Sequence, residues 1–184
     1  MDILGLIPAR GGSKGIPSKN IVPLLGRPLL AYTCETALSS RCLDRIIVST
    51  DDPNIAQVAR EHHAEVPFMR PAELARDDTP SLPVLQHAVN WLRDSEAYNP
   101  DAVMILQPTS PLRRAEHING AAEVMERTGA DTVVSVVEVP RHLSPDYLMR
   151  VENESLVPFL HEGEKVIRRQ DTRLAYVRDG TVYA

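Results

Sequence analysis

Along most of the chain, compact runs of apolar residues alternate with stretches in which apolar residues recur at helical spacing. This pattern predicts strands that alternate with helices. Compact apolar runs predict buried strands over residues 3–7, 45–49, 65–68, 102–106 and 132–137. Apolar residues at helical spacing predict helices over residues 28–39, 54–63, 80–93 and 114–127. Such alternation favours an α/β fold, a doubly wound and mostly parallel sheet with helices on both faces.

The pattern changes after Val139. Residues 140–167 contain short β-like stretches at 147–151 and 156–159, and Asn153-Glu154 predicts a hairpin turn between them. We interpret 140–167 as an excursion from the sheet that serves subunit contact, with a surface loop as the alternative. A strand over 174–183 then returns to the sheet, and we expect a single domain over residues 1–184.

Composition narrows the function classes. The 184 residues carry a formal net charge of −5 and 4% aromatic residues, a balance that argues against a nucleic-acid partner. No apolar run is long enough for a membrane span, and Asp2 and Pro8 interrupt any secretory leader, so no membrane partner is expected. Cys34 and Cys42 lack metal-ligand spacing, and we expect reduced thiols and a cytoplasmic location.

Residues 7–20 form the most informative loop of the sequence. They directly follow the first predicted strand and contain three glycines together with Arg10, Lys14 and Lys19. No Asp or Glu occurs from Ile3 to Cys34, so the region is positive within an acidic chain. Glycines let backbone N–H groups approach an anion, and the cations neutralise it, which predicts a nucleoside triphosphate site. The spacing matches neither a Walker A loop nor a dinucleotide motif, and a solvated surface turn is the alternative.

A second candidate segment, residues 106–113, follows the predicted central strand. Its prolines fix a loop that presents Gln107, Thr109 and Ser110, an amide and two hydroxyls suited to a sugar or ribose. Helix capping by Ser110 before Pro111 is the alternative. Two acidic pairs lie elsewhere in the chain. Asp51-Asp52 predicts a helix cap, with metal binding as the alternative, and Asp77-Asp78 predicts a solvated loop.

Five ordered motifs together resemble the acylneuraminate cytidylyltransferases, or CMP-sialic acid synthetases, over essentially the whole chain. They are Ile-Pro-Ala-Arg-Gly-Gly-Ser-Lys-Gly-x-Pro-x-Lys-Asn at 7–20, Arg-Ile-Ile-Val-Ser-Thr-Asp at 45–51, Arg-Pro-Ala-Glu-Leu-Ala at 70–75, Leu-Gln-Pro-Thr-Ser-Pro-Leu-Arg at 106–113 and Arg-Arg-Gln-Asp at 168–171. The resemblance implies a Rossmann-like fold of the nucleotide-diphospho-sugar transferase type. The first loop differs from that of the Kdo-activating relatives, so a nine-carbon acid is expected rather than Kdo.

The resemblance also implies roles for individual residues. The nucleotide would be bound by Ala9, Arg10, Gly11, Gly12, Ser13, Lys14, Lys19, Asn20, Arg70, Thr79 and Ser81. Arg10 and Lys19 would be the catalytic cations, and a solvated Arg70 is the alternative to a binding role. The sugar acid would be bound by Gln107, Thr109, Ser110, Arg169 and Gln170, with Arg169 and Gln170 reaching a partner subunit's site.

The reaction that the resemblance implies is transfer of CMP from CTP to a nonulosonic acid such as N-acetylneuraminate, with release of pyrophosphate. Mg²⁺ or Mn²⁺ would bind with CTP, and a homodimer is expected. The Asp-x-Asp metal motif of the family is not found, so no metal ligand is assigned, and Asp179-Gly180-Thr181 replaces the usual Asn-Gly-Ala. Legionaminate, pseudaminate or Kdo as substrate, or a non-catalytic nucleotide-binding fragment, are the alternatives.

Overall fold

A computed structural model describes residues 1–160, 168 and 172–184. The chain divides into two compact units, which are described separately: Met1–Ser135 with Gly180–Ala184, and Val136–Asp179. The unit boundary falls within the strands β6 (Val134–Glu138) and β9 (Tyr176–Tyr183). No helix within the described residues is long and apolar enough to cross a membrane.

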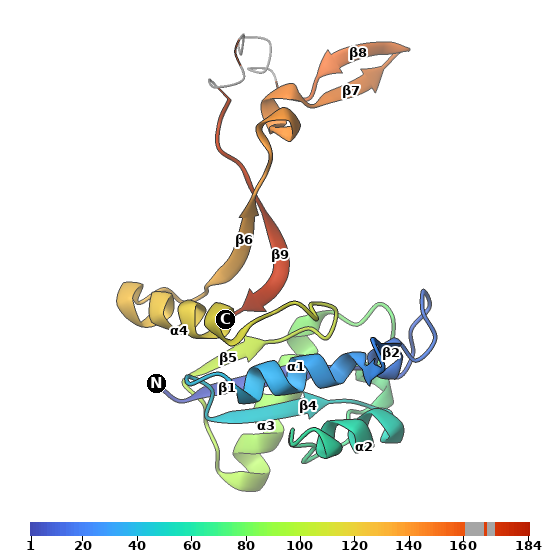
Figure 1. The fold of residues 1–184 in the computed structure, drawn as a ribbon, viewed down its shortest axis with the longest axis vertical. Coiled ribbons are helices and arrows are strands. Elements are labelled where there is room, and N and C mark those ends of the chain that lie inside the picture. The colour runs from blue at the N-terminus through green and yellow to red at the C-terminus, as the bar shows by residue number, and fades with distance from the viewer. Residues whose placement is uncertain (161–167, 169–171) are drawn as a thin grey trace. The chain divides into compact units, whose positions relative to one another are not determined.

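The first unit is a parallel sheet with one antiparallel partner (Figure 1). Besides β6 and β9, its α-helices and longer strands are β1 (Ile3–Pro8), α1 (Leu29–Leu38), β4 (Arg45–Ser49), α2 (Pro53–Glu61), α3 (Ser81–Glu96), β5 (Ala102–Ile105) and α4 (Ala115–Thr128). Strand β1 pairs in parallel with β4 and β5, and β9 joins β5 antiparallel through Ile105 and Tyr183. The sheet order is β4-β1-β5-β9-β6, which confirms the predicted mostly parallel α/β fold.

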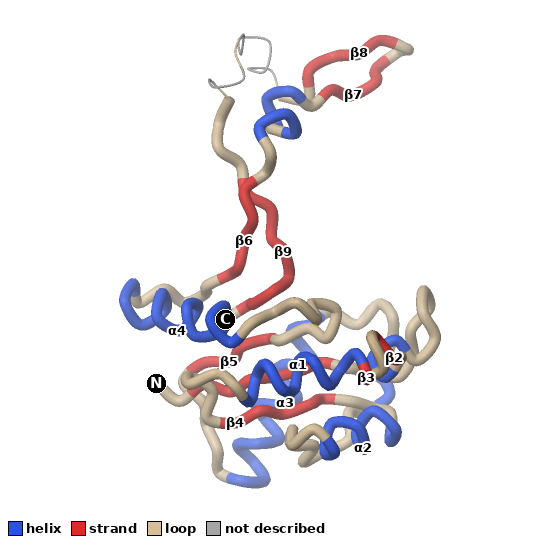
Figure 2. Tube along the Cα trace, in the orientation of Figure 1, coloured by secondary structure: helices blue, strands red, loops and turns tan. Residues whose placement is uncertain are grey.

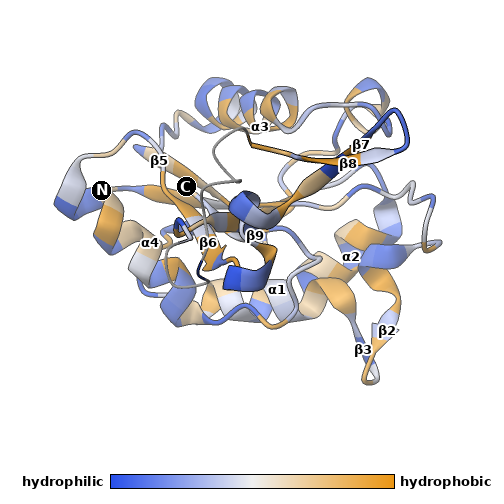
Figure 3. Cartoon of the chain, turned by 90° about the horizontal axis from the view of Figure 1, so that it is seen from above, coloured by the Kyte–Doolittle hydropathy of each residue, from blue (hydrophilic) through white to orange (hydrophobic). Residues whose placement is uncertain are grey.

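Alternating residues of β1 bury the two faces of the sheet. Ile3 and Ile7 belong to a core cluster that includes residues of α1, α2 and α4. Leu4 and Leu6 belong to a second cluster that includes Ala88 and Leu92 of α3. Helices therefore cover both faces, and Figure 3 shows α3 on one side of the strands and α1 on the other.

The carboxyl ends of three strands bring three loops to one edge of the sheet. Pro8 is paired with Ser49, and Leu6 with Ile105, so the segments after β1, β4 and β5 start side by side. In parallel sheets of this kind, ligands bind in the crevice beyond these strand ends.

Two local differences from the sequence prediction have simple causes. The strand predicted over 65–68 is wrong as a full strand: Glu65 makes a single bridge to Ile47, and Pro67, which lacks an N–H group, then breaks the ladder. The short hairpin β2 (Pro23–Leu24) with β3 (Arg27–Pro28) was not predicted. Its turn places Leu25 and Gly26 at positive φ, which glycine tolerates and leucine does not favour.

The second unit contains the predicted hairpin, β7 (Met149–Glu152) with β8 (Ser155–Pro158), drawn in red in Figure 2. Asn153 and Glu154 make its turn with positive φ values, as the sequence predicted. Nearby, the backbone N–H of Arg173 and its Nε donate to the buried carboxylate of Asp146 at 2.8 and 2.9 Å. The hydrogen bonds and charge of Arg173 hold the pKa of Asp146 below its usual value.

Candidate active site

A cleft of about 270 Å³ lies at the carboxyl edge of the sheet within the first unit. Its lining comes from β1 and the loop 9–20, from residues 70–79 and the start of α3, and from the end of β5 with the loop that follows it. The predicted site residues among its lining are Arg10, Gly12, Ser13, Lys19, Asn20, Arg70, Thr79, Ser81, Gln107 and Thr109. Two segments almost a hundred residues apart, predicted separately for nucleotide and sugar, therefore share one cavity.

The loop 9–20 is held by its backbone. Ala9 is fully buried and its N–H donates to the Ser49 carbonyl at 3.0 Å. The Gly11 N–H donates to Asp51 Oδ1, and the Asn20 side chain donates from Nδ2 to the Arg10 carbonyl, both at 2.9 Å. Ala9 and Gly11 thus shape the loop from behind, and neither is among the cleft-lining residues.

Position 11 needs glycine because the backbone there lies close to Asp52, at the start of helix α2. Asp52 begins α2, where its carboxylate accepts from the Asn54 N–H at 2.7 Å and caps the helix as predicted. A Cβ at Gly11 would lie 2.8 Å from Asp52 Oδ2 and 2.9 Å from Asp52 Cβ. A Cβ at Gly12 would meet nothing within 4 Å.

These distances give a matched pair of substitutions. We expect Gly11→Ala to lower the free energy of unfolding by about 1–3 kcal/mol because the added methyl displaces the cap of α2. Gly12→Ala should change it by less than about 0.5 kcal/mol. Urea denaturation of both variants measures the difference, and equal stabilities would contradict the close approach.

Arg10 and Lys14 both pair with a carboxylate that the sequence prediction left as a solvated loop residue. Arg10 forms an ion pair with Asp77, and Lys14 Nζ lies 2.6 Å from Asp77 Oδ2. Lys14 and then Arg10 hold the pKa of Asp77 below its usual value. Asp77 lines the cleft beside Arg10, whereas Lys14 is largely exposed and is not among the lining residues.

Arg70 is a buried cation at the wall of the cleft, which excludes the solvated alternative. Its Nε donates to Ser49 Oγ at 3.0 Å, and its guanidinium also donates to the Ser49 carbonyl. Burial lowers the pKa of Arg70 to about 10; the carboxylate of Asp51 opposes this decrease and the nearby charge of Arg10 adds to it. Arg70 therefore remains charged at neutral pH in a setting that favours an anionic ligand.

The loop after β5 is anchored by Arg113, for which the sequence analysis proposed no role. Arg113 is buried and donates to the carbonyls of Thr181 and Gln107 at 2.5 and 2.7 Å. Gln107 and Thr109 line the cleft, but Ser110 Oγ donates to the Gly180 carbonyl at 3.1 Å and is not among the lining residues. The N-cap residue of α4 is Arg114 and not Ser110, so the capping alternative for Ser110 is not observed.

The remaining predictions concern the partner-site residues and the metal ion. Arg169 and Gln170 lie outside the described residues. In the described part of the chain, no group of three or more His, Cys, Asp or Glu side chains is arranged to hold a metal ion. The carboxylate that lines the cleft, Asp77, is already paired with two cations, so these residues do not fit a protein-held Mg²⁺ site.

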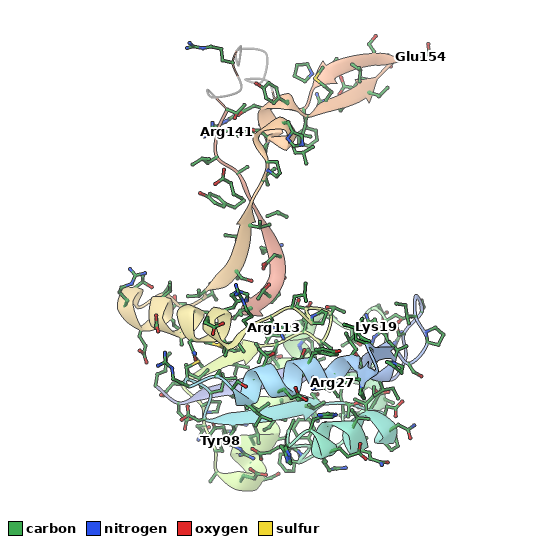
Figure 4. All side chains as sticks on the ribbon, viewed as in Figure 1. Lys19, Arg27, Tyr98, Arg113, Arg141 and Glu154 are labelled. Atoms are coloured by element: carbon green, nitrogen blue, oxygen red, sulfur yellow. The ribbon has the colours of Figure 1, made fainter. Side chains whose placement is uncertain are left out.

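The cleft thus combines four cations, Arg10, Lys19, Arg70 and Arg76, with the polar side chains of Gln107 and Thr109. Lys19 is labelled in Figure 4. Such a set suits a ligand that carries phosphates at one end and hydroxyl groups at the other.

Comparisons with known proteins agree with this arrangement. The chain matches the family described as Cytidylyltransferase over residues 4–182. It is 40% identical to the CMP-N,N′-diacetyllegionaminic acid synthase of Legionella pneumophila, over 100% of this chain and 77% of that protein. It is 34% identical to a pseudaminic acid cytidylyltransferase of Campylobacter jejuni, over 100% and 78% of the two chains. The N-acylneuraminate cytidylyltransferase of Escherichia coli is 37% identical over 80% of this chain and 33% of its own length.

Among solved structures, CMP:2-keto-3-deoxy-manno-octonic acid synthetase complexed with CTP superposes with a TM-score of 0.71 at 20% identity, covering 100% of this chain and 73% of that one. This likeness supports the fold. The protein belongs to the cytidylyltransferase family, and the family resemblance seen in its motifs is confirmed.

Proposed function

We propose that the protein is a CTP-dependent cytidylyltransferase that activates a nonulosonic acid. The observation that carries this proposal is the shared cleft: the cations Arg10, Lys19 and Arg70 open onto the same cavity as Gln107 and Thr109. The named activities of the relatives from Legionella, Campylobacter and Escherichia support the same reaction class.

In the proposed reaction, the anomeric hydroxyl oxygen of the sugar acid attacks the α-phosphorus of CTP. A P–O bond forms to the sugar, the bond to the β-phosphate oxygen breaks, pyrophosphate leaves, and the hydroxyl proton passes to water. Negative charge on the phosphate oxygens is stabilised by Arg10 and Lys19 from the loop and by Arg70, which also lines the cleft.

The sugar acid is assigned to the Gln107 and Thr109 side of the cleft. Arg113 fixes the Gln107 carbonyl, and this leaves the Gln107 amide side chain at the cavity wall. We extend the proposal to Arg169 and Gln170, which the sequence motif assigns to the sugar acid of a partner subunit. The relatives act on legionaminic, pseudaminic and N-acylneuraminic acids by their names, so the substrate is proposed at the level of the nonulosonate class.

Nucleotide choice tests this proposal without the sugar acid. We expect CTP to bind at least about tenfold more tightly than ATP or GTP, because the family and the relatives that the chain matches are named as cytidylyltransferases or CMP-sugar synthases. Calorimetric titration with CTP, UTP, ATP and GTP measures the preference. Tighter binding of a purine nucleotide would overturn the assignment to CTP.

We also propose a cytoplasmic homodimer in which residues 140–167 contact the partner. The hairpin there exposes large apolar side chains, with Val151 71% and Leu156 68% accessible. Exposed apolar groups on a hairpin support an interface. Sedimentation analysis that finds a monomer at micromolar concentrations would contradict this part of the proposal.

A further inference from the structure

The loop that is proposed to bind triphosphate already holds an anion from the protein itself. The Asp77 carboxylate contacts both Arg10 and Lys14, and its two oxygens are shared between them, Oδ1 with Arg10 and Oδ2 with Lys14. The arrangement copies what a phosphate group would offer these cations, two oxygens on one acidic centre. Asp77 also lines the cleft, so it occupies part of the space beside Arg10.

Asp77 lies on a segment whose hydrogen bonds are local. Between Pro71 and Thr79, the backbone bonds run from Leu74 to Pro71, Ala75 to Ala72 and Thr79 to Arg76, and Thr79 Oγ1 donates to the Glu73 carbonyl. Ala72, Glu73, Arg76 and Asp77 are exposed. The ion pairs of Asp77 therefore link this segment to the loop 9–20. Ion pairs between solvent-accessible side chains contribute little stability.

We propose that Asp77 is an internal substitute for the nucleotide phosphates, which holds Arg10 and Lys14 in the ligand-free protein and is displaced when the triphosphate binds. The inference rests on the proposed function, because it takes CTP as the displacing ligand. A triphosphate carries several negative charges against one on Asp77, so it competes successfully for the two cations. Asp77 thus keeps the two cations paired before binding and lowers the affinity for the nucleotide.

The test compares two neighbouring substitutions that remove the same charge. Asp77→Asn removes the competing anion. Asp78→Asn is the matched control, because Asp78 is the next residue and pairs at 3.3 Å with Arg76, another cation that lines the cleft. That pair is longer and joins two largely exposed side chains, so its loss should change nucleotide binding little. We expect Asp77→Asn to bind CTP about three- to tenfold more tightly than the wild type and Asp78→Asn to differ by less than about twofold.

Inorganic pyrophosphate serves as a second probe that lacks base and sugar. The same preference of Asp77→Asn over Asp78→Asn should appear with it, because the competition is for the phosphate-binding cations. If Asp77→Asn binds CTP and pyrophosphate no more tightly than Asp78→Asn, or more weakly, the inference is overturned and Asp77 serves to position the cations.

A double-substitution cycle separates displacement from simple repulsion between Asp77 and the nucleotide. In a Lys14→Gln background, Asp77 has lost one of the two cations it occupies, so the gain from Asp77→Asn should fall to about twofold or less. An undiminished gain in that background would contradict displacement. Failure of the wild type to bind CTP at all would instead reject the proposed function, since the inference predicts weakened binding and not its absence.

Discussion

Replacing Lys19 by alanine should lower turnover about 10²- to 10³-fold and leave the fold intact. Lys19 lines the cleft at the start of the short helix Lys19–Ile21. Among the residues that the structure describes, Asp77 pairs with Arg10 and Lys14 and not with Lys19. In the proposed reaction, Lys19 would meet the phosphate oxygens directly, and its loss would remove a charge that stabilises the transition state. Pyrophosphate release under saturating substrates measures the effect.

Arg93→Ala is the matched control for Lys19→Ala. Arg93 lies on α3, is half exposed and pairs with the adjacent Asp94 at 2.8 Å, away from the residues that line the cleft. It removes one positive charge, as Lys19→Ala does, and should retain wild-type turnover. Full activity in Lys19→Ala, with thermal unfolding unchanged, would reject the assignment of the loop to the phosphates.

Replacing Arg70 by methionine should weaken CTP binding about 10- to 100-fold while the free energy of unfolding changes by less than about 1 kcal/mol or increases. A buried guanidinium costs desolvation free energy in the folded state, and a methionine of similar length removes that cost. In the proposed site, the same substitution would also remove a charge-assisted contact to the nucleotide. Calorimetric CTP titration and urea denaturation of one protein sample separate the two effects.

The difference in unfolding free energy between the wild type and Arg70→Met should depend on pH in one direction. Burial lowers the pKa of Arg70 to about 10, below its ordinary value, so the folded state releases the proton before the unfolded state does. Below about pH 10 the buried charge lowers the stability of the wild type relative to Arg70→Met. Above that pH the difference should shrink. A large loss of stability in Arg70→Met at neutral pH, with CTP affinity unchanged, would show that Arg70 acts only through Ser49.

The fold was largely predictable because its strands are short apolar runs with clear punctuation. The strand Arg45–Ser49 was predicted residue for residue, and the cap of α2 was predicted within the pair Asp51-Asp52, since an apolar run followed by Asp-Pro is typical of a strand and a helix start. Of that pair, Asp52 caps the helix and Asp51 accepts from the Gly11 N–H. The hairpin turn at Asn153-Glu154 was predicted for the same reason. The bridge at Glu65 and the β2–β3 hairpin each involve the pairing of very few residues, which apolar periodicity does not encode.

The candidate site was predictable as a set of residue types but not as a set of contacts. Glycines and cations on one loop predicted an anion site, and Arg10, Lys19 and Gln107 do line one cleft. The pairing of Asp77 with Arg10 and Lys14 was missed, because an Asp-Asp pair in a polar segment is usually solvated. The anchoring role of Arg113 was missed as well, because its partners Thr181 and Gln107 lie on different segments of the chain.

The most direct test of the central claim is pyrophosphate release by the purified protein with CTP, Mg²⁺ and a nonulosonic acid, using N-acetylneuraminate, legionaminate and pseudaminate in parallel and Kdo for comparison. The proposed function predicts release that requires both CTP and one of the nine-carbon acids, with formation of an equal amount of the CMP-sugar. Release that occurs with a purine triphosphate, or that proceeds equally well without any sugar acid, would contradict it.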